Sequence, residues 1–225
     1  MKPSIIWTTL LIVLYALFCL WYGGIPDPLS PEEVETYMSR MRSEVLVNLE
    51  ATVSDQDRET IEAFSQEIER IEAFLLADDG RSFVMVNLLN LNDVQPETAP
   101  EDQPNRLLNE YSSGFFTILI GRAGHPVLLG GISSQPIDLW GMTNAAEWTS
   151  VGLVRYRSRR DFAEIATSAG IGDVYPLKIR ALEQTLAVPA SPWWYAGDPR
   201  LLLGLLVGLP LLTWWGGRLS PRPPQ

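Results

Sequence analysis

Hydrophobic residues gather in two uncharged runs, one near each end of the chain. The first run, IIWTTLLIVLYALFCLWY, covers residues 5–22, and the second, LLLGLLVGLPLLTWW, covers residues 201–215. Eighteen residues of α-helix rise about 27 Å, which is close to the hydrocarbon thickness of a bilayer. Tryptophan and tyrosine residues border both runs, and such rings favour the headgroup layer. The pattern therefore predicts two transmembrane helices, a first anchor within residues 1–23 and a second helix within residues 191–217.

Each apolar run also has an alternative interpretation. Lys2 gives the first run the positive start of a secretory signal peptide, although the run is longer than a usual signal core and no small-residue cleavage site follows it. The second run has the length of a buried core helix, and it contains Pro210. A helix in lipid tolerates such a proline, because neighbouring groups satisfy the freed carbonyl. The aromatic borders favour two spans, and whether the first is cleaved stays open.

Residues 24–79 contain a short linker and two amphipathic helical patterns. The stretch Ser30-Pro31-Glu32-Glu33 has the form of a capping box, and apolar residues follow it at helical spacing. A second helix is expected to begin near Ser54, with apolar residues that alternate in steps of three and four. This narrow seam fits either a helix packed on the domain or a surface for a partner helix. The seam consists of Ile61, Phe64, Ile68, Ile71 and Leu75.

Residues 80–190 alternate between strand and helix patterns. The predicted strands are FVMVNLLNLN at 83–92, HPVLLGGIS at 125–133, WTSVGLVRYR at 148–157 and LAVPA at 186–190. A helix pattern covers residues 107–122, although its segment FFTILI at 115–120 fits a strand equally well. A second helix follows Ser158 and is expected to break at Gly170 and Gly172.

The order of these elements is strand, helix, strand, strand, helix, strand. This order predicts an α+β domain of ferredoxin-like βαββαβ topology, in which helices cover one face of a four-stranded antiparallel sheet. The whole chain is then N-terminal helices and this sheet domain, flanked by two transmembrane helices.

Charge separates the middle of the chain from its ends. All 27 acidic residues lie within residues 27–198, whereas Lys2 precedes the first apolar run and two arginines follow the second, in the short basic tail 218–225. Because positive flanks stay in the cytoplasm, we expect both termini to be cytoplasmic and the central domain to lie on the periplasmic side of the inner membrane. Such an acidic domain is a poor partner for nucleic acid. The one cysteine, Cys19, lies in the first run, so the domain must hold by packing without disulfides.

Three segments of the central domain carry a family resemblance. They are MVNLLNL at 85–91, GHPVLLGG at 124–131 and the strand-to-helix junction VRYRSRRDF at 154–162. Together they resemble a family of small bacterial domains of unknown function in the dimeric α/β-barrel superfamily, over about residues 80–190. The resemblance implies that a second copy covers the sheet face without helices, so that both faces of the first strand want apolar residues. The two membrane runs and the acidic loop at 92–105 depart from that family.

Five residues are candidates for ligand binding. Asn87 lies inside an apolar strand, where an unsatisfied amide costs about 1–3 kcal/mol, so it either bonds to neighbouring backbone or lines a small pocket. Tyr111 and Trp148 either line a pocket or fill the core. His125 is the only histidine; haem-handling members of the superfamily make it a candidate haem ligand, and it also fits a strand entry. Arg155 either binds an anion, lies on a solvated rim or pairs with an acidic residue.

The remaining motifs bear on the membrane and on chemistry. Gly204 and Gly208 have the GxxxG spacing that lets membrane helices approach closely. The sequence contains no P-loop, dinucleotide fingerprint, HExxH or CxxC motif, and we expect no metal and no cofactor.

The expected function is a binding or assembly module, anchored in the lipid bilayer and paired as a homodimer through its sheet face. One alternative is a cofactor-free or haem-linked oxygenase or isomerase-like enzyme that acts on a small hydrophobic molecule. The other is an accessory subunit of a larger complex, with a partner membrane protein. The sequence names neither the ligand nor the partner.

Overall fold

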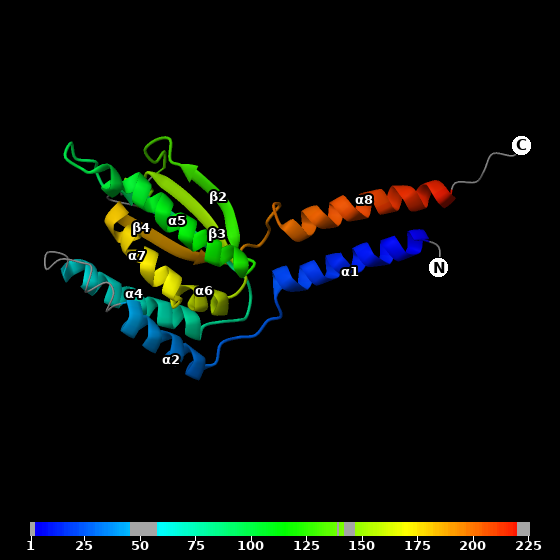
Figure 1. The fold of residues 1–225 in the computed structure, drawn as a ribbon, viewed down its shortest axis with the longest axis horizontal. Helices are drawn as coiled ribbons and strands as arrows, with labels where there is room; N and C mark the ends of the chain where they lie inside the picture. The colour runs from blue at the N-terminus through cyan, green and yellow to red at the C-terminus, as the bar shows by residue number, and fades with distance from the viewer. Residues whose placement is uncertain (1–2, 46–57, 139, 142–146, 220–225) are drawn as a thin grey trace, which may run out of the picture. The chain divides into compact units, whose positions relative to one another are not determined.

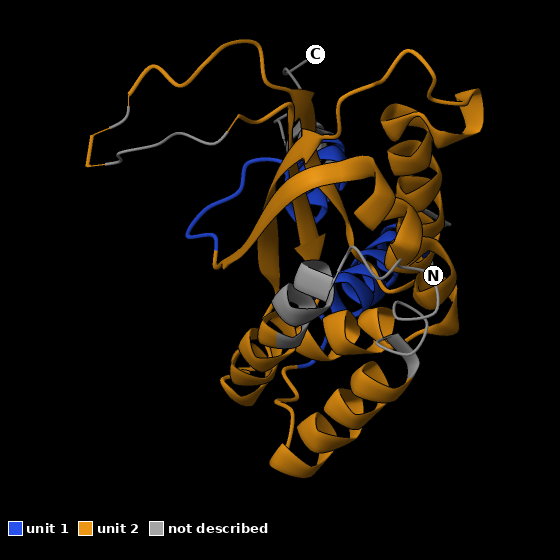
Figure 2. Ribbon diagram, turned by 90° about the vertical axis from the view of Figure 1, so that its left-hand side faces the viewer, with its two compact units in different colours: residues 1–25, 192–225 blue, residues 26–191 orange. Residues whose placement is uncertain are grey.

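The computed structural model describes residues 3–45, 58–138, 140–141 and 147–219. The chain divides into two compact units, which Figure 2 colours separately. One unit comprises residues 26–191, and the other combines residues 1–25 with residues 192–225.

A four-stranded antiparallel sheet lies at the centre of the unit formed by residues 26–191 (Figure 1). Its strands are β1 (Phe83–Leu91), β2 (His125–Gly131), β3 (Ser150–Tyr156) and β4 (Leu182–Ala190), in the spatial order β2-β3-β1-β4. β1 is an inner strand that pairs with β3 on one side and with β4 on the other. The prediction of a mixed α+β domain with such a sheet is confirmed.

Helices cover one face of this sheet. The helices of this unit are α2 (Pro31–Arg40), α4 (Arg58–Leu76), α5 (Pro104–Gly121), α6 (Arg159–Ala166) and α7 (Ala169–Ala181), with a π-helical turn at Met41–Val45 and a 3₁₀ turn at Pro100–Asp102. Met85 of β1 and Val154 of β3 pack in one buried cluster with Leu119 of α5, Ile165 of α6 and Ile171 of α7. Because side chains alternate along a strand, the residues between them point to the opposite face.

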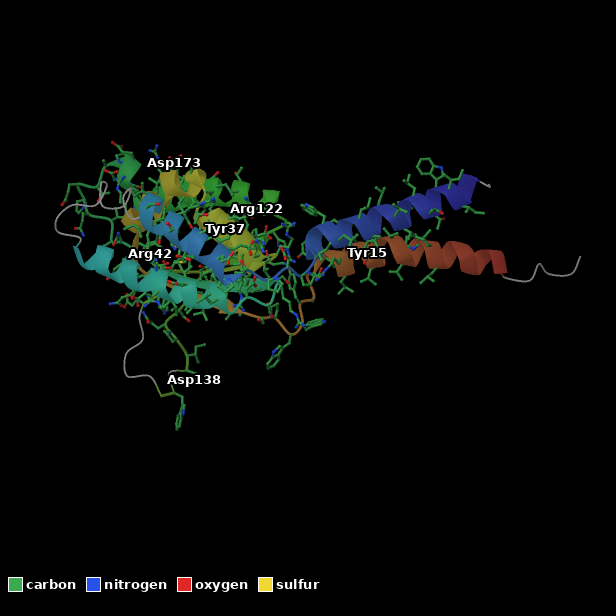
Figure 3. The ribbon with its side chains drawn as sticks, turned by 90° about the horizontal axis from the view of Figure 1, so that it is seen from below. Tyr15, Tyr37, Arg42, Arg122, Asp138 and Asp173 are labelled. Carbon is green, nitrogen blue, oxygen red and sulfur yellow. The ribbon has the colours of Figure 1, made fainter. Side chains whose placement is uncertain are left out.

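α2 begins where the capping box predicts. The Ser30 hydroxyl accepts a hydrogen bond from the Glu33 N–H, and the Glu33 carboxylate accepts one from the Ser30 N–H at 2.8 Å. Beyond this start, Val34 and Met38 are buried against α4. Arg42, labelled in Figure 3, pairs with Glu72 of α4 at 2.8 Å and ties the two helices together.

The described part of the apolar seam on α4 packs inside the chain. Ile68 and Leu75 are buried in one cluster with Met38 of α2 and Ala163 of α6, and Ile71 packs against the same cluster. The expected start of the helix near residue 54 and the seam side chains at 61 and 64 lie outside the described residues. Residues 26–79 and the sheet belong to one compact unit.

The helix bounds decide two predictions that concern α5 and the break after α6. The ambiguous segment at 115–120 is helical and belongs to α5. The expected break at Gly170 and Gly172 is wrong, because both glycines lie within α7, and the chain breaks at Thr167 and Ser168 instead. There the Thr167 hydroxyl donates to the carbonyl of residue 163 at 2.8 Å and the Ser168 hydroxyl donates to that of residue 165 at 2.7 Å. Each carbonyl also accepts a backbone N–H bond from the same residue, at 3.0 Å in both cases, so the hydroxyl groups add to the hydrogen bonding at the end of α6.

The other unit contains two helices, α1 (Pro3–Gly23) and α8 (Pro199–Leu219). Within the described residues, α1 is the one helix long and apolar enough to cross a membrane, with a mean hydropathy of 2.1 over its Ile5–Gly23 portion; the apolar portion of α8, Pro199–Leu212, is shorter. The two helices contact each other, and the hydroxyl of Tyr15 (Figure 3) donates to the Arg200 carbonyl at 2.9 Å. α8 continues through Pro210 as predicted.

Candidate functional site

A cavity of about 380 Å³ lies between the sheet and the helices of residues 26–191. Its floor is the helix-covered face of the sheet, and its walls come from α4, α5, α6 and α7, with one residue from the turn after α2. Most of the lining is aliphatic or aromatic. The polar and charged residues of the lining are Glu67, Arg70, Asn87, Tyr111, Ser112, Tyr156, Tyr175 and Lys178.

Small residues in the sheet make room for this cavity. Asn87 of β1 lies opposite Gly152 on β3 and opposite Ala187 on β4, and Gly152 in turn lies opposite Leu129 on β2. This row of the sheet therefore carries a glycine and an alanine on either side of Asn87. The rows toward the buried end of the sheet are filled by larger side chains, such as Tyr156. The hollow follows from side-chain volume at one level of the strand ladder.

Asn87 combines both of the roles predicted for it. Its amide nitrogen donates to the Met85 carbonyl at 3.2 Å and to the Gly152 carbonyl at 3.1 Å, which joins β1 to β3. The side chain also lines the cavity. Among the described residues, no hydrogen bond reaches its amide oxygen, so this acceptor is available to a ligand.

Three tyrosines bring rings and hydroxyl groups to the cavity: Tyr111 of α5, Tyr156 of β3 and Tyr175 of α7. Tyr111 stacks on Phe115 with ring centroids 5.8 Å apart. Tyr156 stacks on Phe83 at 5.0 Å. Burial raises the pKa of all three hydroxyl groups above the ordinary value. They therefore remain neutral in physiological conditions and can donate hydrogen bonds.

Lys178 is a cavity residue that the sequence analysis missed. Its Nζ lies 5.6 Å from the ring centroid of Tyr175 and 6.0 Å from that of Tyr111. Burial lowers the pKa of its amine, and the nearby Glu67 opposes that effect. A signal was available, because the chain contains fifteen arginines and only one lysine besides Lys2. Lysine and arginine are not interchangeable at functional sites, so this lysine merited attention.

The other predicted ligand-binding residues do not line the cavity. His125 and Arg155 lie opposite each other in the β2–β3 ladder, on the face away from the helices. Arg155 is buried, and its guanidinium donates to the Ala123 carbonyl at 2.9 Å. Nδ1 of His125 lies 2.9 Å from its neighbour's carbonyl oxygen. Trp148 is half-buried just before β3. Ligand-binding roles for these three residues stay predictions, and the part of the chain that the structure describes holds no group of three metal-binding side chains.

The glycine pair of the second apolar run, Gly204 and Gly208, lies in α8. A methyl group at Gly204 would lie 2.7 Å from the Tyr15 hydroxyl, so α8 approaches α1 closely at this position. At Gly208 an added methyl group would meet no described atom within 4 Å. A role for the pair in packing between membrane helices stays a prediction.

Comparisons with known proteins find structural similarity only. No protein-family profile matches the chain, and no curated protein matches it. It is similar to the crystal structure of RPA0582, a protein of unknown function from Rhodopseudomonas palustris, with 17% identity, 56% of this chain and 94% of that chain covered, and a TM-score of 0.48. Methylated RPA0582 matches with 18% identity, coverage of 59% and 93%, and a TM-score of 0.46. At3g17210 from Arabidopsis thaliana matches with 16% identity, coverage of 51% and 98%, and a TM-score of 0.35.

Proposed function

We propose that the protein is a membrane-anchored module that binds a small, mostly apolar molecule in the cavity between its sheet and its helices. The observation that carries this proposal is the cavity itself. Its volume of about 380 Å³ falls in the range of about 300–1,000 Å³ that is typical of small-molecule sites. Such sites combine an apolar lining with a few converging polar groups. Here Asn87, the tyrosines and Lys178 are those groups.

A binding experiment tests the cavity directly. The uncharged fluorophore 2-naphthalenemethanol is titrated into the full-length protein in detergent, against a protein-free detergent blank. The variant Gly152→Val places three carbon atoms in the cavity beside Asn87, and its first carbon has room, since it would approach Leu129 no closer than 3.4 Å. We expect its affinity to fall about tenfold or more.

The matched control is Gly130→Val on β2. This glycine lies on the opposite face of the sheet, and an added methyl group would meet only Val151, at 4.0 Å. We expect this variant to bind the fluorophore as the wild type does. If the two variants bind equally well, or if the wild type binds neither this fluorophore nor its carboxylate analogue 2-naphthoate, the proposed cavity function is wrong.

The fold assignment can be extended to a ferredoxin-like topology. The strand order β2-β3-β1-β4, with α5 between β1 and β2 and with α6 and α7 between β3 and β4, supports a split βαβ arrangement. In this proposal the helices before β1 are additions to the core pattern.

We further propose that two copies of the domain pair through the open face of the sheet. On this face, Leu128, Leu186 and Val188 are 51%, 45% and 45% exposed, and Val86 and Leu153 lie between them. An antiparallel sheet with one face in water normally carries polar residues there. An apolar face of this kind favours burial, and a second copy offers an equally apolar surface.

The proposal for the membrane retains two spans, α1 and α8, with both termini in the cytoplasm and the domain outside it. The apolar sequence of α1 supports the first span. The basic tail and the exposed Trp193 and Trp194 before α8 support the second, because indole rings favour the interface. Fusing a reporter that is active on only one side of the membrane to each terminus tests this orientation, and an external C-terminus would contradict it.

A further inference from the structure

The cavity wall contains an amine without a carboxylate partner. Arginines elsewhere in the domain pair with acidic residues: Arg122 with Glu164, Arg157 with Asp161, and Arg160 with Glu33. Lys178 does not, since within the described residues no carboxylate oxygen lies within 4.0 Å of its Nζ.

Two tyrosine rings are the contacts of this amine. The rings of Tyr175 and Tyr111 lie 5.6 Å and 6.0 Å from Nζ, near the outer limit of a cation–π contact. Such contacts compensate only in part for the loss of water around a cation. The lowered pKa of Lys178 has the same cause, because the effect of burial exceeds the opposing effect of Glu67. A negatively charged group beside Nζ would supply the missing interaction.

The other charges of the wall leave a net positive site. Glu67 and Arg70 lie one helical turn apart on α4 and also line the cavity. With Lys178 they give two positive charges and one negative charge. The wall as a whole therefore attracts an anionic ligand, whereas Glu67 repels it. Removing the charge of Lys178 is expected to weaken binding of an anion, and removing the charge of Glu67 is expected to strengthen it.

The size of the cavity limits the apolar part of the ligand. Water occupies about 30 Å³ per molecule in the liquid, so the cavity corresponds to on the order of a dozen non-hydrogen atoms. Phe74, Phe116 and Ile171 belong to the lining that would contact such a hydrocarbon.

We infer, on the basis of the proposed binding function, that the ligand is an apolar carboxylic acid of about this size whose carboxylate pairs with Lys178. The tyrosine hydroxyls and the Asn87 amide complete the polar end of the site. A charge-assisted hydrogen bond between an ammonium group and a carboxylate is roughly twice as strong as a bond between neutral groups.

The test compares an acid with its uncharged analogue. 2-Naphthoate and 2-naphthalenemethanol are titrated separately into the full-length protein in detergent. We expect the wild type to prefer the acid, and Lys178→Met to weaken acid binding roughly 10- to 100-fold while alcohol binding stays within about twofold. We expect Glu67→Gln to strengthen acid binding a few-fold and to leave alcohol binding unchanged.

A second measurement uses the wild type alone, so that it does not depend on the folding of a variant. Because the chain has only two lysines, ¹³C-labelled lysine gives two side-chain NMR signals, and Lys2 serves as the internal reference. We expect 2-naphthoate to raise the apparent pKa of Lys178 above its value in the free protein, and we expect 2-naphthalenemethanol not to raise it. The groups that face this amine in the titration are Glu67 and Arg70 of α4, Tyr111 of α5 and Tyr175 of α7.

The outcomes distinguish the inference of a carboxylate ligand from the proposal that the cavity binds a small molecule. If the wild type binds the alcohol but shows no preference for the acid, or if Lys178→Met retains the preference, the carboxylate inference is wrong and the cavity function stands. If neither compound binds the wild type, both are wrong.

Discussion

Gly124 occupies a position where a single methyl group has no room. It joins the end of α5 to β2, and an added Cβ would lie 2.3 Å from a methyl carbon of Leu119 and 2.9 Å from the carbonyl oxygen of Arg155. Leu119 is fully buried, so it cannot move out of the way into solvent. The Gly124 N–H also donates to the Leu119 carbonyl at 3.0 Å, which fixes the backbone at this close approach.

We therefore expect Gly124→Ala to lower the free energy of unfolding by about 1–3 kcal/mol, the usual cost of overpacking a core. Urea unfolding followed by tryptophan fluorescence measures this change. Gly121→Ala is the matched control, because an added methyl group there meets no described atom within 4 Å and alanine favours the helix. Equal stability of the two variants would show that the loop at residue 124 relaxes freely.

Residue chemistry was only partly predictable from the sequence. An amide in an apolar strand has to find hydrogen-bond partners, and Asn87 does donate to two neighbouring backbone carbonyls. His125 and Arg155 attracted attention by residue type, yet strand register places them away from the cavity. For Lys178 the sequence offered one signal, the scarcity of lysine in the chain, and tertiary packing is what brings this residue near Glu67 and the tyrosines.

Between elements, an ion pair joins the first turn of α2 to that of α6. Arg160 contacts the Glu33 carboxylate at 2.5 Å and Asp27 at 3.1 Å. The Arg160 guanidinium, followed by the hydrogen bond from the Ser30 N–H, lowers the pKa of Glu33 from its ordinary value of 4.5 to about 2. The Glu33 side chain is well exposed, so screening by water and salt keeps the energy of the pair small.

The depressed pKa fixes the pH range of this contribution. A carboxylate with a lower pKa in the folded state stabilises the fold above its ordinary pKa and loses that effect as the pH falls toward the folded value. We expect Glu33→Gln to melt slightly below the wild type at pH 6, and we expect this difference to shrink below pH 4.5 and to nearly vanish as the pH falls through about 2. Melting curves of both proteins across this range measure the gap.

Glu32→Gln on the same helix is the control for loss of a negative charge alone. It should leave the gap to the wild type nearly constant over the same range. A gap that does not narrow for Glu33→Gln would mean that Arg160 does not stabilise the folded state through this carboxylate.

The elements themselves followed from local patterns where the controlling interactions are local. The capping box predicted the start of α2, a near-continuous apolar run predicted β1, and β-branched and aromatic residues predicted β3. The segment at 115–120 could not be assigned from its apolar run, since a buried helix and a buried strand share that composition. The break between α6 and α7 lies at Thr167 and Ser168, whose hydroxyl groups bond back to α6, whereas the prediction relied on the two nearby glycines.

At the scale of the whole molecule, the inner strand β1 carries apolar side chains on both faces of the sheet. Helices of residues 26–191 cover the face of Met85, whereas Val86 and Val188 lie on the opposite face of the sheet. The near-continuous apolar run of β1 predicted apolar side chains on both of these faces. The sequence also predicted two membrane helices. Within the described residues, α1 meets the requirements of length and hydropathy, and the apolar stretch found in α8, Pro199–Leu212, is shorter.

Pairing of two copies through the open sheet face predicts that one charge there disrupts the assembly. Val188 is 45% exposed on β4 and lies beside Val86 in the β1–β4 ladder. In a symmetric dimer, Val188→Glu introduces the charge twice, into a surface that excludes water. We expect the dissociation constant of the dimer to rise roughly 100-fold. Sedimentation in density-matched detergent measures the mass of the protein component.

The control places the same charge on an apolar residue of similar exposure away from the sheet. Leu76, at the end of α4, is 55% exposed, and Leu76→Glu should leave the dimer intact. Val188 is partly exposed in a single copy, so its replacement should lower the melting temperature of the monomer little. A melting curve therefore separates loss of the dimer from loss of the fold. A wild-type protein that sediments as a monomer at all concentrations, or a Val188→Glu variant that dimerises as tightly as the wild type, would show that something other than a second copy covers this face.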